Sequence, residues 1–82
     1  NPFNPETIIR YNLPENIFVN ITVYDLLGKK VITLVNQAHV AGPQSVVWNA
    51  NDDYGKRVGA GIFLYQIHAG DFIETRKMVL LK

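Results

Sequence analysis

The stretch Ile17-Phe18-Val19-Asn20-Ile21-Thr22-Val23-Tyr24 decides the fold class of this chain. Every second residue from Ile17 to Val23 is a β-branched apolar residue, whereas the residues between them are mixed in polarity. Successive side chains of a strand point to opposite faces, so this alternation predicts a strand with one face in a hydrophobic core. β-branched residues also suit a half-buried strand.

Comparable strand patterns recur along the chain, with turn residues between them. Pro14-Glu15-Asn16 breaks the first pattern, and Gly70-Asp71 is a two-residue hairpin signal before the last one. We expect a loop at 36–43 that carries Gly42-Pro43, and a longer irregular stretch at 49–61. The other strands are expected at 6–13, 30–35, 44–49, 62–69 and 72–82.

Short strands spaced roughly 8–12 residues apart, with no helical period, are typical of an all-β sandwich. We therefore predict an immunoglobulin-like or fibronectin III-like sandwich of about seven antiparallel strands. A small barrel is the alternative. The 82 residues are expected to form a single domain over 1–82, near the lower end of what folds on its own core.

The composition is that of a globular domain, with 48% hydrophobic and 18% charged residues. A formal net charge of +1 gives no electrostatic reason to bind nucleic acid or an anionic membrane. No apolar run approaches the roughly 20 residues of a membrane span. The chain has no cysteine, so it has no disulfide framework. Domain-like sequence starts at Asn1-Pro2-Phe3 without a signal peptide, so we expect a piece of a longer parent protein, monomeric when isolated.

One turn sequence occurs twice. The segment from Asp25 to Val31 matches the segment from Asp52 to Val58 at the Asp, Gly, Lys, basic and Val positions. Asp caps turns through its carboxylate and Gly supplies a positive φ, so one turn chemistry used twice explains the match. A duplicated ligand site is the alternative.

The loop at 49–53 gathers side-chain oxygens. Calcium takes about six to eight oxygen ligands, which makes Asn51, Asp52 and Asp53 candidate ligands together with Asn49. The spacing does not match an EF-hand, and no Glu closes the set. Asn and Asp also gather in loops because they cap turns, and the sequence favours that interpretation over a metal site.

The sequence offers no set of catalytic groups. His39 and His68 are its only histidines, without a Cys or carboxylate at a metal-ligand spacing. Ser45 is its only serine and has no nucleophile-elbow pattern. The carboxylates fall on strands and turns, with nothing that marks a cleft. We expect no enzyme activity and no cofactor.

The aromatic residues leave a carbohydrate-binding function open. Trp48 follows Val46 in an expected strand, a pattern typical of a sandwich core, whereas Tyr54 lies in the irregular stretch and is expected to be exposed. One exposed aromatic residue makes a poor platform for a sugar ring.

The end of the chain permits two interpretations. Charges occupy the first half of 72–82, and Met78 to Leu81 are all apolar. A central strand buried on both faces produces such a run. A strand that a partner recognises by edge pairing and by its side chains is the other possibility.

Taken in order, these segments resemble the type IX secretion C-terminal sorting domains (type A), which belong with the immunoglobulin-like domain of the flagellar hook-capping protein. The resemblance covers almost the whole chain. Asn49 and Ala50 depart from it, because members often carry Asp and then Gly there. It rests on Asn1-Pro2-Phe3-Asn4-Pro5, Thr7 to Glu15, Val23 to Val31, Val47 to Asn49, Gly55 to Val58, Gly61 to Tyr65 and Lys77 to Lys82.

The resemblance implies a non-catalytic C-terminal domain that directs a larger bacterial protein, such as a secreted hydrolase, across the outer membrane and attaches it to the cell surface. The implied partners are the outer-membrane secretion machinery and a sortase-like peptidase of a Gram-negative bacterium. A carbohydrate-binding module and a passive structural sandwich are the alternatives. The residues expected to meet the partner are Gly55, Gly61, Lys77, Met78, Val79, Leu80, Leu81 and Lys82.

Overall fold

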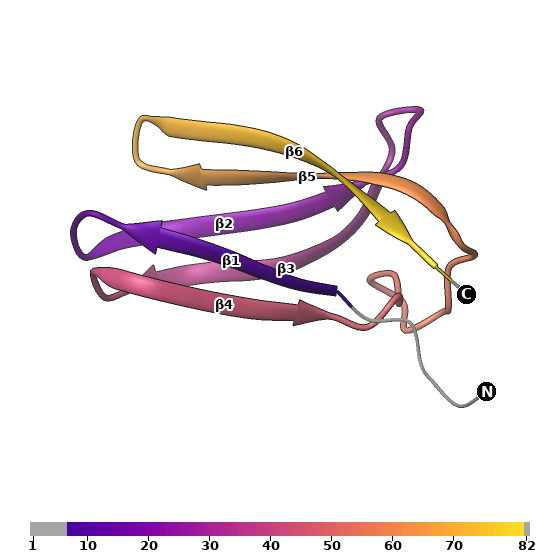
Figure 1. Cartoon of the computed structure of the whole chain (residues 1–82), viewed down its shortest axis with the longest axis horizontal. Helices are drawn as coiled ribbons and strands as arrows, with labels where there is room; N and C mark the ends of the chain where they lie inside the picture. The colour runs from indigo at the N-terminus through magenta and orange to yellow at the C-terminus, as the bar shows by residue number, and fades with distance from the viewer. Residues whose placement is uncertain (1–6, 82) are drawn as a thin grey trace.

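The computed structural model describes residues 7–81, and strands make up the regular structure of this part. Figure 1 shows that the strands run along the long axis of the molecule in two layers. The described residues form no helix that is long and apolar enough to cross a membrane. The strands are β1 (Thr7–Leu13), β2 (Ile17–Tyr24), β3 (Lys30–His39), β4 (Gly42–Trp48), β5 (Gly61–Ala69) and β6 (Phe72–Leu80).

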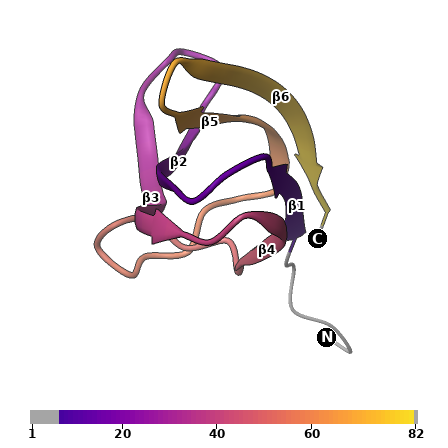
Figure 2. The same cartoon turned by 90° about the vertical axis from the view of Figure 1, so that its left-hand side faces the viewer.

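The strands form two sheets, one of four strands in the order β3-β2-β5-β6 and one of β1 and β4. Each neighbouring pair is antiparallel. In Figure 2 the larger sheet curves over the smaller one, with β4 near β3 and β1 on the side of β6. The predicted all-β sandwich is confirmed, although residues 7–81 contain six strands where about seven were expected.

The alternation in β2 places this strand at the centre of the fold. Val19, Ile21 and Val23 are fully buried, whereas Phe18 on the other face is 55% exposed. β2 pairs with β3 on one side and β5 on the other, so its backbone has partners along both edges. The predicted strand and its core face are confirmed.

Two hydrophobic clusters make up the core. The first joins both sheets through β1, β2, β3 and β5, and the second surrounds Trp48 at the other end of the sandwich. The buried members of the first are Ile9, Leu13, Val19, Ile21, Val35, Ile67 and Ala69. Those of the second are Val23, Trp48, Ala50, Phe63, Met78 and Leu80.

Trp48 is completely buried, as its strand pattern predicted. Its ring meets Phe63 edge to face, with 5.1 Å between the ring centroids. Its indole Nε1 donates a hydrogen bond to the carbonyl oxygen of Asn51 at 2.9 Å. This side chain therefore anchors the start of the 49–61 stretch to the core and is not available to stack on a sugar. Tyr54 is 94% exposed, which confirms the prediction for that residue.

Ala50 occupies a backbone conformation that glycine normally adopts, with φ at 67°. It is the position at which the resembling family often has Gly. The methyl group of Ala50 is fully buried in the Trp48 cluster. Burial of that methyl offsets part of the cost of the left-handed conformation.

The loop expected at 36–43 is wrong, because β3 continues to His39 and β4 begins at Gly42. Residues 36–39 pair with residues 17–20 of β2. Residues 36–38 are exposed, so backbone pairing with β2 holds this part of the strand in the sheet. The sequence therefore shows no alternation of buried and exposed residues that would predict this part of the strand. The Asn20 amide also donates to Asn36 Oδ1 at 3.3 Å.

We predict that Trp48→Phe lowers the free energy of unfolding by about 2–4 kcal/mol. The substitution leaves a cavity beside Phe63 and removes the N–H group that donates to the Asn51 carbonyl. Urea denaturation followed by circular dichroism measures the change. Tyr54→Ala is the control, and an exposed aromatic should change stability by less than about 0.5 kcal/mol. A Trp48→Phe loss no larger than that of the control would contradict the anchoring role.

Candidate functional site

The turn between β2 and β3 is organised by Asp25. Its Oδ1 accepts hydrogen bonds from the backbone N–H groups of Leu27 and Lys29, each at 2.9 Å. The N–H of Gly28 donates to the Asp25 carbonyl at 3.0 Å, and Gly28 has a φ of 87°. Because a side chain at this φ is strained, the turn requires the Asp and the Gly at this spacing.

The turn at Asp52 repeats this geometry. Asp52 Oδ1 accepts from the N–H groups of Tyr54 and Lys56, each at 2.9 Å. The N–H of Gly55 donates to the Asp52 carbonyl at 3.0 Å, and Gly55 has a φ of 78°. The sequence repeat is thus one turn chemistry used twice, as favoured above, and Gly55 has a backbone role in this turn.

Asp53 ties the irregular stretch to the edge of the larger sheet. Its Oδ1 accepts from the N–H of Thr33 at 3.2 Å, and its own N–H donates to the Val31 carbonyl at 3.0 Å. Lys30 Nζ lies 3.3 Å from Asp53 Oδ2. The segment 49–61 is therefore fixed against β3 at the side where β4 lies.

The candidate calcium ligands Asn51, Asp52 and Asp53 lie next to one another in this segment, but their polar groups serve other partners. The carboxylates of Asp52 and Asp53 accept the bonds described above. The amide of Asn51 donates to Asn49 Oδ1 at 3.2 Å. Among residues 7–81, His, Cys, Asp and Glu side chains form no group of three or more that could hold a metal ion.

The last strand, β6, forms one edge of the larger sheet, and in the part of the chain that the structure describes it pairs only with β5. Its side chains divide cleanly between two faces. Met78 and Leu80 point into the core, where they are 8% and 2% exposed. Lys77 and Val79 point outward and are exposed. The interpretation of 78–81 as a central strand buried on both faces is therefore wrong, because β6 lies at the edge of the sheet and the outward side chains of Val79 and Leu81 are exposed.

The candidate recognition residues are thus split by the fold. Met78 and Leu80 hold the strand in register, and a partner on the outer face would meet Lys77, Val79 and Leu81. Gly61 begins β5 opposite Leu80, so the two candidate segments meet at this end of the sheet. Lys82 and the Asn1 to Pro5 motif lie outside the described residues.

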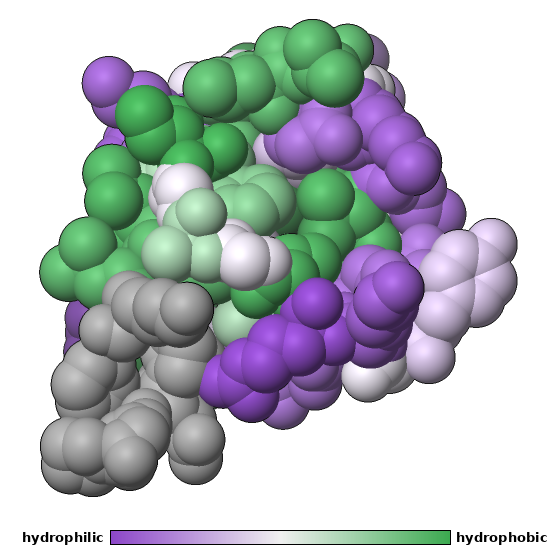
Figure 3. All heavy atoms as spheres, turned by 90° about the vertical axis from the view of Figure 1, so that its right-hand side faces the viewer, coloured by the Kyte–Doolittle hydropathy of each residue, from purple (hydrophilic) through white to green (hydrophobic). Residues whose placement is uncertain are grey.

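Exposed apolar side chains gather where β6 ends. Val79, 54% exposed, lies opposite Ile62 on β5, which is 41% exposed. Leu81 follows β6 and is 71% exposed. Figure 3 faces this end of the molecule and shows hydrophobic atoms over a large part of it, beside a polar region. Sequence alternation could have identified Val79 and Leu81 as a pair, but only their exposure in the folded domain shows that their face is uncovered.

We predict that Asp25→Ala and Asp52→Ala each lower the free energy of unfolding by about 1–2 kcal/mol, because each leaves two backbone N–H groups without their carboxylate acceptor. Urea denaturation of the single and double variants measures the losses, which should add because the turns are separate. Glu15→Ala, which removes another exposed turn carboxylate, is the control. A large loss at one Asp and none at the other would contradict the shared role.

Comparison with known proteins shows the fold and no closer relationship. No protein-family model matches the chain, and no curated protein matches it. Among solved structures, FlgD from P. aeruginosa matches with a TM-score of 0.73 and 22% identity, over 92% of this chain and 59% of that one. FlgD from Xanthomonas campestris, described in connection with the hook capping essential for flagellar assembly, matches with a TM-score of 0.73 and 24% identity, over 94% and 56%.

A third similar structure is that of dimeric latent PorU from Porphyromonas gingivalis. It has a TM-score of 0.71 and 20% identity, over 96% of this chain and 8% of that one. The chain therefore corresponds to less than two thirds of each of these proteins. Its fold is the β-sandwich found in part of two hook-capping proteins and in part of PorU.

Proposed function

We propose that this chain is a non-catalytic C-terminal domain that directs a longer bacterial protein across the outer membrane and attaches it to the cell surface. Its partners in this proposal are the outer-membrane secretion machinery and a sortase-like peptidase, at the surface of a Gram-negative bacterium. The sequence resemblance to type IX sorting domains supports the proposal. The fold that the chain shares with part of PorU is consistent with it.

The observation that carries the proposal is the position of β6. An edge strand presents backbone N–H and C=O groups that no other strand of the domain uses, and a partner can pair with them by strand addition. β6 combines this free edge with exposed Val79 and Leu81. Natural edge strands often carry charged side chains that discourage pairing with other chains. Lys77 is such a residue beside Val79 and Leu81.

In this proposal the two faces of β6 have different roles. The inner face, with Met78 and Leu80, anchors the strand by burial in the Trp48 cluster. The outer face, with Val79, is then held rigidly at a fixed register. In this proposal the partner recognises the outer face of β6 only after the core has formed and the domain has folded.

A passive structural or assembly module is the second candidate, and the likeness to the two hook-capping proteins favours it. In that function the sandwich acts as a spacer, and the identity of the outward β6 residues is unimportant. The two functions therefore differ in what they predict for Val79 and Leu81.

The deciding experiment fuses a reporter enzyme upstream of this chain in a bacterium that has a type IX system, and measures the fraction of reporter at the cell surface and in the medium. The test variant is Val79→Glu/Leu81→Glu. We expect export to fall by about tenfold or more, because carboxylates placed in an apolar contact cost well over ~1.4 kcal/mol.

The matched control is Ile8→Glu/Val47→Glu. These residues form a directly opposed pair on the outer face of the smaller sheet, and they are 47% and 50% exposed. The control should export like the parent. Equal export of both variants would overturn the sorting function and favour the passive module. Deleting 79–82 is a poorer test, since it also removes the buried Leu80 and so disturbs the fold.

A further inference from the structure

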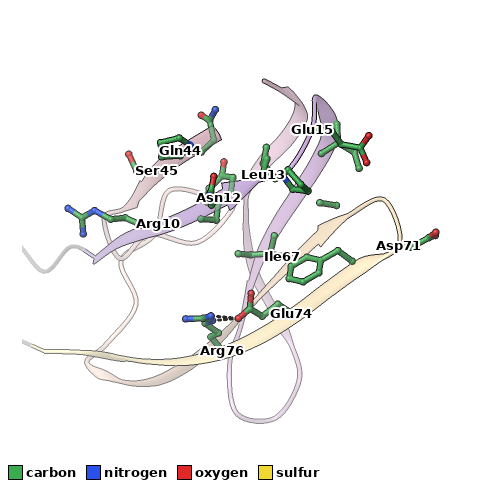
Figure 4. Close-up of a pocket in the computed structure, with 16 residues that line it drawn as sticks. Arg10, Asn12, Leu13, Glu15, Gln44, Ser45, Ile67, Asp71, Glu74 and Arg76 are labelled. Atoms are coloured by element: carbon green, nitrogen blue, oxygen red, sulfur yellow. Dashed lines mark hydrogen bonds and ion pairs between the residues drawn. The ribbon is translucent and has the colours of Figure 1, made fainter. Parts of the chain in front are cut away.

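The sandwich is closed along one side and open along the other. On the closed side, β4 lies near β3, and Asp53 bonds the 49–61 segment to β3. On the open side, within residues 7–81, β1 pairs only with β4, and β6 pairs only with β5. A groove with a volume of about 1150 Å³ separates β1 from β6, as Figure 4 shows.

The floor of the groove is apolar and belongs to the core. Buried Leu13, Ile67 and Ala69 line it, together with half-buried Tyr11. Phe72 lies on the same face of β6 as Met78 and Leu80, as strand alternation requires, but it is 56% exposed. The exposure of this inward-facing ring shows that the core is open to solvent at the groove.

The charges around the groove differ between its two ends. Glu15, in the β1–β2 turn, and Asp71, in the β5–β6 hairpin, lie toward one end in Figure 4. Arg10 lies toward the other end, as does Arg76, which forms an ion pair with Glu74. The groove is therefore acidic at the hairpin end and carries its two arginines at the opposite end.

We propose that this groove binds an extended peptide segment of another protein as an additional strand on β6. The free edge of β6 supplies main-chain hydrogen bonds, and alternate apolar side chains of the peptide cover Phe72 and the core floor. A basic peptide side chain faces Glu15 and Asp71, and an acidic one faces Arg10. Arg10 and Glu15 are five positions apart on the chain, as are Asp71 and Arg76, so an extended peptide of about seven residues reaches both ends of the groove. This proposal uses the same free edge of β6 as the secretion function, but a peptide can bind the groove whether or not the domain directs secretion.

Antiparallel pairing with β6 and the charge pattern together set the order of the charged residues in the peptide. β6 runs from Phe72 at the acidic end toward Arg76. A strand that pairs antiparallel with β6, as β5 does, runs from the arginine end to the acidic end. Its acidic residue therefore precedes its basic residue, and both share a face with the apolar positions. The capped peptide with the one-letter sequence DTVTVTK has this pattern.

Fluorescence anisotropy of labelled DTVTVTK, titrated with the 82-residue chain, tests the proposal. We expect saturable binding below about 1 mM that weakens with salt, since exposed charges contribute to it. A peptide with Pro in place of the central Thr loses a backbone donor and should bind at least about tenfold more weakly. Absence of saturable binding, or equal binding of the Pro peptide, would overturn the proposal.

Two substitutions test the groove itself. Phe72→Thr should weaken binding by about tenfold, because it removes the apolar surface that the peptide covers. Phe18→Thr is the matched control, since Phe18 is 55% exposed but lies on the outer face of the larger sheet, and its binding should stay within about twofold of the parent. Equal binding by the two variants would place the peptide elsewhere and overturn the proposal.

The charge requirement is tested with Glu15→Lys/Asp71→Lys, which should weaken DTVTVTK binding about fivefold or more at low salt. Urea denaturation confirms that each variant is folded. Sedimentation velocity of the chain alone distinguishes a second copy as the occupant. A dimer that Phe72→Thr dissociates would overturn the peptide proposal in favour of self-association.

Discussion

The structure depends on the burial of one face of β2 between the two sheets. Val19, Ile21 and Val23 are fully excluded from solvent, and they link the two hydrophobic clusters along the sandwich. The chain has no cysteine, so apolar packing carries the contact between the sheets without disulfide support. In a chain of 82 residues, that contact leaves little stability to spare.

The two long sides of the sandwich are treated differently, and this asymmetry determines where partners can bind. The 49–61 segment occupies the side at β3. Trp48 anchors it to the core through the Asn51 carbonyl, and Asp53 anchors it to β3 through the N–H of Thr33. Among the described residues no segment covers the side at β6 in this way, and β6 keeps a free edge. Its outer face, with Val79, and the groove beside Phe72 are therefore distinct surfaces on a single strand.

The local chemistry of the candidate site was predictable from the sequence, but the contacts of its residues with distant segments were not. The Asp and Gly of the repeated turn identified their backbone role, because that geometry is set by residues only a few positions apart. The partners of Asp53 were not predictable, since Thr33 lies twenty positions away in the sequence and no local pattern joins the two. The extension of β3 to His39 was missed for the same reason, because its polar residues enter the sheet only through pairing with β2.

The sequence by itself determined the positions of most strands, the inward face of β2, the burial of Trp48 and the exposure of Tyr54. These follow from alternation and turn chemistry, which act between near neighbours. Only the tertiary structure decided that β6 is an edge strand, that Met78 and Leu80 face the core, and that a groove separates β6 from β1. Strand order is set by pairing between distant segments, and a two-residue period is the same for an edge strand as for a central one.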